Sequence, residues 1–334
     1  MTAAEKTPTR TALLAGFAAI YVIWGSTYLG IRVAVETMPP FLMAGARFLV
    51  AGSILAAWIA WQHGFKATRR QWLDNAVIGG LLLLGGNGLV SWAEQKIPSG
   101  IATLIISIGP LFIVLFDWLV LAVGKDATRG TRPTAATFIG LALGFVGLAV
   151  LVGPDLSKEG AAGLDMWRVG GLILACISWG IGSIYTRYAR NPAEPFTGAA
   201  MQQLTGAGWL FLVSLLCREP FNFDVSAVSG HSWLAWGYLV IAGSLVGFTT
   251  FVWLMKHSTP ARVATYAYVN PIVAVFLGWA ILDETISPRI FLGAAVIIAG
   301  VAIITTAKNK KQVATPPRQA VAATATPAAA TASD

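Results

Sequence analysis

Long apolar runs separated by short polar segments make up most of this chain. An α-helix needs about 20 mostly apolar residues to cross the hydrocarbon core of a bilayer, and the chain contains a succession of runs near that length. Prolines stand at or just before several of their starts, where the missing N–H costs a helix no hydrogen bond. We therefore expect an all-α membrane protein with ten transmembrane helices. The expected spans are residues 11–31, 41–61, 75–93, 99–123, 133–153, 169–186, 196–217, 232–255, 263–282 and 290–307.

Composition and charge support a membrane protein. Hydrophobic residues make up 56% of the chain and charged residues 11%, about half the charged share of a soluble domain. The net charge of +8 does not indicate nucleic acid as a partner, because the basic residues form short clusters between the apolar runs. With the N-terminus in the cytoplasm, most of the 23 Lys and Arg fall in inner segments. The positive-inside rule therefore favours cytoplasmic termini at both ends.

Connections between the expected spans are short and leave no room for a soluble domain. We expect a cytoplasmic N-terminus (1–10), a first five-helix repeat (11–153), a second five-helix repeat (169–307) and a disordered cytoplasmic tail (308–334). The tail is rich in Lys and then in Ala, Thr and Pro, a composition that does not form a packed core.

The second half of the chain repeats features of the first. Trp24 matches Trp179, and Pro110 matches Pro271, in a nearly constant frame. Since five helices are an odd number, the second copy enters the membrane upside down. Many secondary transporters are built from inverted repeats, and they hold the substrate near the middle of the membrane between the two halves.

Several short motifs give the chain a family resemblance over residues 11 to 307. The motifs are Ile23-Trp24-Gly25-Ser26, Pro40-Phe41, Arg47-Phe48, Ala93-Glu94-Gln95, Pro98-Ser99-Gly100, Gly109-Pro110-Leu111-Phe112, Ser178-Trp179-Gly180, Asn270-Pro271, Leu282-Asp283-Glu284 and Gly293 to Gly300. With them the chain resembles the drug/metabolite transporter superfamily, with two EamA-type repeats, and is similar to the bacterial inner-membrane exporters called YedA-like. The resemblance implies export of amino acids or related metabolites, sometimes drugs. The first copy lacks the acidic pair Asp283-Glu284, so any role of that pair is not symmetric.

Arg47 is the most distinctive polar residue within an expected span. It lies about seven residues into the second span, roughly 10 Å deep at 1.5 Å per residue. A charge at that depth costs at least ~2.5 kcal/mol on insertion scales. Two roles remain open: a two-pronged contact with a substrate carboxylate, or a structural role in which the side chain snorkels or pairs with a helix-end carbonyl. The matching position of the second repeat holds Gln202, a neutral amide.

Aromatic and amide side chains in the spans are candidates for the wall of the same cavity. Trp24 and Tyr28 share one helix face, and so do Tyr266 and Asn270, because residues four apart lie on one side of a helix. Tryptophans in the middle of a span favour a cavity wall, since lipid-facing tryptophans concentrate at the interface. Asn87 lies in a glycine-rich span where helices approach closely.

Two acidic residues are less informative. Glu94 is a candidate acceptor for a substrate amine or a proton, but a solvated residue paired with Lys96 is the favoured interpretation. Asp117 is interpreted mainly as an interfacial side chain that snorkels. The predicted substrate-binding residues are Arg47, Trp24, Tyr28, Asn87, Glu94, Trp179, Gln202, Tyr266 and Asn270, with helix breaks at Pro110 and Pro271.

Enzyme signatures are absent from the sequence. It contains no HExxH motif, Walker loop or nucleophile elbow, so ATP cannot drive the protein directly and no cofactor is expected. Cys176 and Cys217 lack metal-ligand spacing and are interpreted as buried small hydrophobes. We expect a secondary exporter of small molecules in the bacterial cytoplasmic membrane. The alternatives are an uncoupled facilitator or channel and, from another class, a membrane-embedded enzyme or interaction subunit; the oligomeric state stays open.

Overall fold

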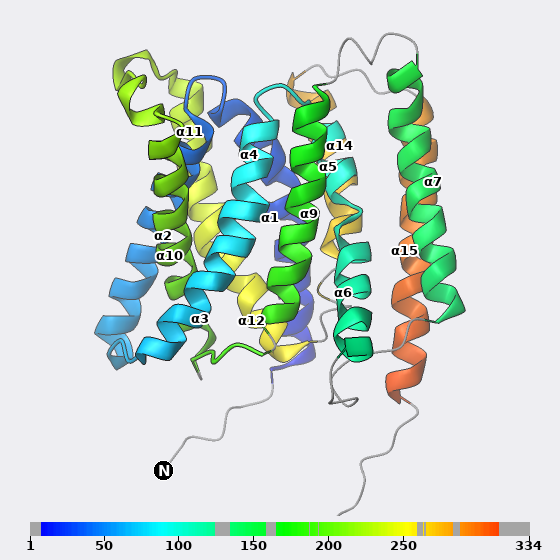
Figure 1. Ribbon diagram of the computed structural model, residues 1–334, viewed down its shortest axis with the longest axis horizontal. Helices are drawn as coiled ribbons and strands as arrows, with labels where there is room; N and C mark the ends of the chain where they lie inside the picture. Colours follow the sequence, from blue (N-terminus) through cyan, green and yellow to red (C-terminus); the bar gives the residue numbers. More distant parts are fainter. Residues whose placement is uncertain are drawn as a thin grey trace, which may run out of the picture.

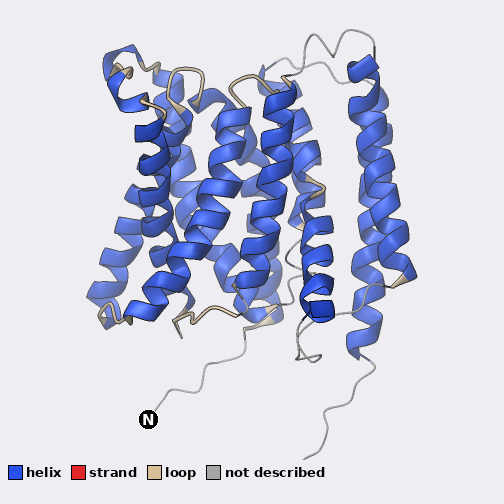
Figure 2. Ribbon diagram, in the orientation of Figure 1, coloured by secondary structure: helices blue, strands red, loops and turns tan. Residues whose placement is uncertain are grey.

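The computed structural model describes residues 8–123, 134–157, 165–186, 188–192, 194–258, 263, 265–282 and 288–313. All regular structure in these ranges is helical, as the sequence predicts. Figure 1 shows long helices lying side by side along a common direction, and Figure 2 shows only helix and short loops among the coloured residues.

The helices of the first half are α1 (Arg10–Ala34), α2 (Pro40–His63), α3 (Arg69–Gly79), the π-helix η1 (Gly80–Gly88), α4 (Leu89–Ala93), α5 (Ser99–Ile106), α6 (Gly109–Val123) and α7 (Ala135–Ser157). Those of the second half are α9 (Met166–Tyr185), α10 (Pro195–Leu216), the short 3-10 turns η2 (Glu219–Phe221) and η3 (Val225–Ala227), α11 (Gly230–Tyr238), the π-helix η4 (Leu239–Phe248), α12 (Thr249–His257), α14 (Tyr266–Leu282) and α15 (Pro288–Val313).

Each predicted span overlaps one of these helical segments. Among the described residues, seven segments are long and apolar enough to cross a membrane, and two shorter apolar helices follow them. The seven are Arg10–Ala34, Pro40–Gln62, Arg69–Ala93, Ser99–Val120, Met166–Tyr185, Pro195–Leu216 and Gly230–His257; the shorter two are Val269–Ile281 and Phe291–Gly300. The total of ten transmembrane helices stays a prediction.

Helix boundaries differ from the expected spans where local chemistry, and not apolarity, sets them. The third helical segment begins at Arg69, before its apolar run, because Thr68 and Gln71 form a reciprocal capping box. Residues 99–123 are not one helix, since α5 ends at Ile106 and α6 begins at Gly109. At the end of the described chain, α15 continues to Val313, beyond the predicted end at 307.

Two π-helical segments occupy corresponding places in the two halves. η1 lies in the middle of α3–η1–α4, and η4 lies in the middle of α11–η4–α12. In Figure 1 the first of these segments rises from α3 to α4, whereas the second descends from α11 to α12. π-helical turns are rare and frequently occur at functional sites. The sequence analysis did not predict them.

Helices from one half pack mainly on helices from the other. The principal pairs are α2 with α10, α1 with α14, α6 with α9, and α7 with α15. Glycines permit these approaches: a Cβ atom on Gly25 of α1 would lie 2.6 Å from Val273, and one on Gly180 of α9 would lie 3.1 Å from Phe112. The α7–α15 pair stands at one side of the bundle in Figure 1.

Candidate functional site

A cavity of about 80 Å³ lies where the two halves meet. Its walls come from α1, α2, η1, α4, α5, α6, α9, η4 and α14, so both π-helices and helices of both halves contribute. The volume is enough for several water molecules. Six of the nine predicted binding residues line it: Trp24, Tyr28, Arg47, Asn87, Trp179 and Tyr266. Pro110, one of the two predicted helix breaks, also lines it.

Arg47 places a buried guanidinium group at this cavity. Its side chain is 2% exposed and its Nη2 donates to Oδ1 of Asn87 at 2.9 Å. The guanidinium carbon lies 4.2 Å from the ring centre of Phe48, within the range of a cation–π contact. Nε and Nη1 are buried and have no hydrogen-bond partner. Two nitrogens of the buried guanidinium are therefore unused, at a cavity lined mostly by apolar side chains.

Glu94 is fully buried, so the favoured interpretation of a solvated interfacial residue was wrong. Its expected partner Lys96 instead pairs with Asp165 at 3.7 Å. Glu94 does not line the cavity, but it is close enough to Arg47 and Tyr28 to interact electrostatically with both. Asp117 is also buried and does not snorkel to an interface.

Aromatic rings fill the side of the cavity nearest α12. Trp24 is central, with its ring centre 4.8 Å from Tyr266, 5.0 Å from Phe251 and 5.7 Å from Trp179. Edge-to-face arrangements at such distances are favourable between aromatic rings. Phe251, on the far side of this aromatic cluster, lines a second cavity of about 240 Å³. Rings of this cluster therefore line both cavities.

Trp24 and Trp179, the two tryptophans of the aromatic cluster, each pack against a glycine of a π-helix in the other half. A Cβ atom added to Gly86 of η1 would lie 2.6 Å from the ring of Trp179, and one added to Gly247 of η4 would lie 2.7 Å from Nε1 of Trp24. Each contact joins one half to the other, and only glycine leaves room for the indole ring. Sequence reasoning found the tryptophans but not these glycines.

The remaining predicted residues lie away from the first cavity. Gln202 lines the second cavity and donates from Nε2 to Oδ1 of Asn75 at 2.9 Å. With its amide nitrogen turned toward them, Asn270 donates to the carbonyl oxygens of Tyr266 at 2.9 Å and Tyr21 at 3.3 Å. It therefore links α14 to α1. Pro271 lies inside α14, which continues through it.

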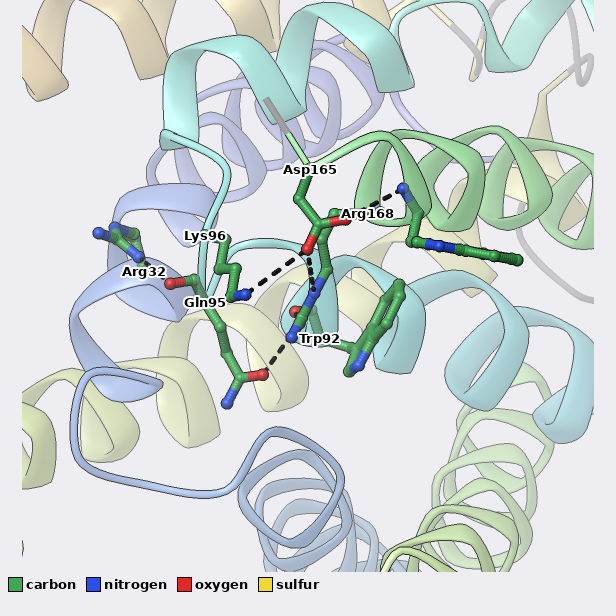
Figure 3. Close-up of polar contacts among 7 residues, drawn as sticks. Arg32, Trp92, Gln95, Lys96, Asp165 and Arg168 are labelled. Carbon is green, nitrogen blue, oxygen red and sulfur yellow. Dashed lines mark hydrogen bonds and ion pairs between the residues drawn. The ribbon is translucent and has the colours of Figure 1, made fainter. Parts of the chain in front are cut away.

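Near the first cavity, at the upper edge of Figure 1, a cluster of polar contacts joins the end of α4 to the start of α9. We call Trp92, Gln95, Lys96, Asp165 and Arg168 the outer clasp, after the side of the membrane on which the positive-inside rule places them. Figure 3 shows Arg168 reaching across to the carbonyl oxygen of Trp92 and to Oε1 of Gln95, the latter at 2.9 Å. Its guanidinium carbon lies 4.0 Å from the ring centre of Trp92.

Charges and backbone bonds complete the outer clasp. Asp165 lies 3.7 Å from both Lys96 and Arg168, and it caps α9 by accepting from backbone N–H groups. Arg32, from α1, donates to the carbonyl oxygens of Glu94 at 2.6 Å and Gln95 at 2.9 Å. The outer clasp therefore satisfies carbonyl groups at the end of α4 with cations from two other helices.

Sequence reasoning missed several other residues at the cavity. Cys176 lines it and is buried, as predicted for that side chain, whereas Cys217 is exposed. Phe48 and Phe248 also line it, although apolar side chains gave no signal that set them apart from core residues. Among the described residues, no group of three or more His, Cys, Asp or Glu side chains is arranged to hold a metal ion.

The structure is a bundle of long apolar helices around a central cavity, and comparison with known proteins gives its family. The EamA-like transporter family matches residues 10–153 and again residues 166–306, so the chain belongs to that family. It is 35% identical over 291 residues to the inner membrane transporter YedA of Escherichia coli (strain K12), covering 87% of this chain and 89% of that protein. The localisation predicted from sequence, a bacterial inner membrane, is confirmed by this relative.

Two further comparisons give another relative and a solved structure of the same fold. The chain is 25% identical over 301 residues to the probable amino-acid metabolite efflux pump of Escherichia coli (strain K12), covering 85% of this chain and 91% of that protein. A solved crystal structure has the same fold, with a TM-score of 0.64 and 24% identity, and the match covers 89% of this chain and 98% of that one.

Proposed function

We propose that this transporter exports small metabolites, amino acids or related compounds among them, by alternating access between two inverted five-helix repeats. The proposal includes ten transmembrane helices with both termini in the cytoplasm. Matched π-helices that run in opposite directions support the inverted arrangement. A relative bearing the name of an amino-acid metabolite efflux pump supports the substrate class and the direction of transport.

The observation that carries the proposal is that two buried nitrogens of the Arg47 side chain have no hydrogen-bond partner. A buried N–H group left without a partner costs about 1–3 kcal/mol, and more when the group is charged. Two nitrogens of Arg47 have no partner, and the Arg47 side chain lines the cavity between the halves. A substrate carboxylate would accept from one of these two nitrogens together with the second N–H of Nη2, in a bidentate, charge-assisted contact. Glu94, in electrostatic reach of Arg47, is proposed to receive the substrate amine or a proton.

The aromatic cluster favours alternating access over an open channel. Trp24, Trp179, Tyr266 and Phe251 lie between the two cavities and leave them separate. A substrate would pass from one cavity to the other only when these rings move apart. Because the rings come from both halves, a rocking motion of one repeat against the other would separate them.

Transport by purified protein in proteoliposomes tests the proposal. Labelled amino acids and small carboxylates should accumulate above equilibrium when a proton or sodium gradient is imposed, and accumulation should stop when an ionophore removes the gradient. Arg47→Gln should lose carboxylate transport, whereas Arg218→Gln, in the loop before η2, should retain it. Flux that only equilibrates the substrate in every gradient would identify an uncoupled facilitator. Full carboxylate transport by Arg47→Gln would contradict the assignment of the site.

A further inference from the structure

The second cavity is larger than the first, at about 240 Å³ against about 80 Å³. It is lined by η1 of the first half and by α9, α10 and α12 of the second. Of its lining residues, Asn191 and Lys256 are exposed, whereas Ser183, Gln202 and Phe251 are buried. The cavity therefore leads inward from the surface at the end of α12, which lies at the lower edge of the bundle in Figure 1.

The internal repeat relates the second cavity to the first. Five positions that line the first cavity have repeat partners that line the second: Tyr28 with Ser183, Ile31 with Thr186, Arg47 with Gln202, Val90 with Phe251, and Gly243 with Leu82. The first three pairs follow the frame that joins Trp24 to Trp179, and the last two follow the frame that joins Gly86 to Gly247. The second cavity is thus the repeat counterpart of the first, and in an inverted repeat such a counterpart faces the other side of the membrane.

The paired positions differ in their chemistry. Arg47 and Tyr28 bring a cation and a phenol to the first cavity, whereas Gln202 and Ser183 bring an amide and a small hydroxyl to the second. The amide of Gln202 is held by its bond to Asn75. Ser183 is 4% exposed and its Oγ has no hydrogen-bond partner. Burying a hydroxyl without a partner is unfavourable, so a ligand in the cavity would gain by bonding to it.

Apolar side chains form much of the remaining wall of the second cavity. Leu82, Phe251 and Met255 line it, and the first two are almost fully buried. Its volume lies below the ~300 Å³ at which pockets for drug-sized ligands begin, so the ligand that fits is a small metabolite. That ligand has an apolar body and a group that bonds to a hydroxyl, which both donates and accepts. An amino acid with an apolar side chain has both features.

We propose that the second cavity binds amino acids with apolar side chains, which occupy it from the cytoplasm before they reach Arg47. One polar group of the amino acid bonds to Oγ of Ser183, and its side chain packs on the apolar wall. The ring centre of Phe251 lies 5.0 Å from that of Trp24 in the first cavity, so movement of these rings would open a path to Arg47. The inference rests on the proposed function, in which this end of the bundle faces the cytoplasm.

Protection of a thiol in the purified full-length protein tests this site without a transport measurement. Val252 lines the second cavity and is half-buried. In a Cys176→Ser/Cys217→Ser background, Val252→Cys therefore reports occupancy through its rate of reaction with a thiol reagent. Leucine should slow that reaction in a saturable way. Alanine should protect more weakly, by about fourfold for each carbon atom that it lacks relative to leucine.

The hydroxyl of Ser183 is tested by comparing two buried serines. Ser183→Ala should weaken protection by leucine about twofold to tenfold. It should not lower the melting temperature, because the hydroxyl has no partner in the protein. Ser244 of η4 is also buried with an unpartnered hydroxyl, and it is not among the described residues that line either cavity. Ser244→Ala is therefore the matched control, and leucine should protect it as it protects the parent.

Three results would overturn the proposal. Failure of leucine, methionine and phenylalanine alike to protect the Val252→Cys thiol would exclude apolar amino acids from the cavity. Equal effects of Ser183→Ala and Ser244→Ala would mean that the Ser183 hydroxyl does not bond to the ligand. Loss of protection in Arg47→Gln would mean that the amino acid binds at the first cavity. The proposed function fails on a different result, carboxylate transport that survives Arg47→Gln, so the two failures are distinguishable.

Discussion

At the scale of single residues, Arg47 occupies a position for which the sequence left two roles open. A structural arginine would reach an interface or bind a helix-end carbonyl, but Arg47 is buried and its hydrogen bond goes to the side chain of Asn87. Two of its nitrogens have no acceptor. The contacts with Asn87 and Phe48 leave these two nitrogens of the desolvated guanidinium unused, which favours the binding role.

Replacing Arg47 should change substrate selectivity more than it changes folding. Arg47→Lys should transport carboxylates poorly, because an ammonium group lacks the planar two-pronged geometry of the guanidinium. Arg47→Gln, which copies the Gln202 position of the other half, should lose roughly 1.5–3 kcal/mol of carboxylate binding, about tenfold to a hundredfold in apparent affinity. Uptake of several amino acids and one cationic dye, normalised to protein in the membrane, measures this.

The cationic dye serves as the internal control for that experiment. A counter-charge for carboxylates is not needed for a cation, so dye transport should be reduced less than amino-acid transport. Equal loss for every substrate, together with lower protein in the membrane, would point to a structural arginine and contradict the binding role.

Gly86 should be intolerant of even one added carbon. Gly86→Ala would place Cβ 2.6 Å from the ring of Trp179, and overpacking of that kind costs about 1–3 kcal/mol. We expect a lower melting temperature in detergent and reduced transport. Gly208→Ala, in α10 with no atom within 4 Å of the new Cβ, should leave both unchanged. If Gly86→Ala combined with Trp179→Leu is no more stable than Gly86→Ala alone, the clash with the indole is not the cause.

At the scale of helices, the outer clasp should control access to the first cavity from outside. Cys176 lines that cavity and is buried, so in a Cys217→Ser background it reports opening through its reaction with a thiol reagent. Arg168→Gln removes the contacts to Trp92 and Gln95 that join α9 to α4. A loss near 1.4 kcal/mol would raise the open population, and the labelling rate with it, by about tenfold.

The matched control for the outer clasp is Arg218→Gln, which removes an arginine from an exposed turn. Its labelling rate should equal that of the parent protein. Identical rates for Arg168→Gln and the parent, at equal stability, would show that the clasp does not hold the outer end closed.

Apolar runs and prolines sufficed to place the helices, because the bilayer requires long apolar segments of any sequence that crosses it. They did not predict the π-helices, since the hydrogen-bonding register of a helix depends on packing across the two halves, as at Gly86 and Gly247. Arg47, Trp24 and Trp179 of the first cavity were predictable from their depth, whereas Phe48 and Phe248 were not. Asn270 was not, because its bond to the Tyr21 carbonyl joins segments far apart in the sequence. Trp24 therefore lines the first cavity and Asn270 does not, although both were expected to line one cavity.

At the scale of the whole molecule, the two halves share a backbone plan but differ in their polar residues. The matching π-helices and tryptophans follow the repeat, whereas Arg47 corresponds to Gln202 and Asp165 corresponds to Arg10. Symmetry of the backbone permits two similar conformations that open to opposite sides, and the unequal polar residues give the two ends different chemistry. If the proposed function holds, these unequal residues would give the two conformations different affinities for a ligand.

The orientation of the whole molecule can be tested with single cysteines and a membrane-impermeant thiol reagent in intact cells. Lys66, in the loop between α2 and α3, lies at the opposite end of the bundle from Asp224, at the start of η3. If the positive-inside rule sets the topology, cysteines near Lys66, Arg129 and Lys308 should be protected, and those near Lys158 and Asp224 should be labelled. Permeabilised cells supply the control, because every cysteine should then react. Labelling near Lys66 and Arg129 from outside would reverse the orientation.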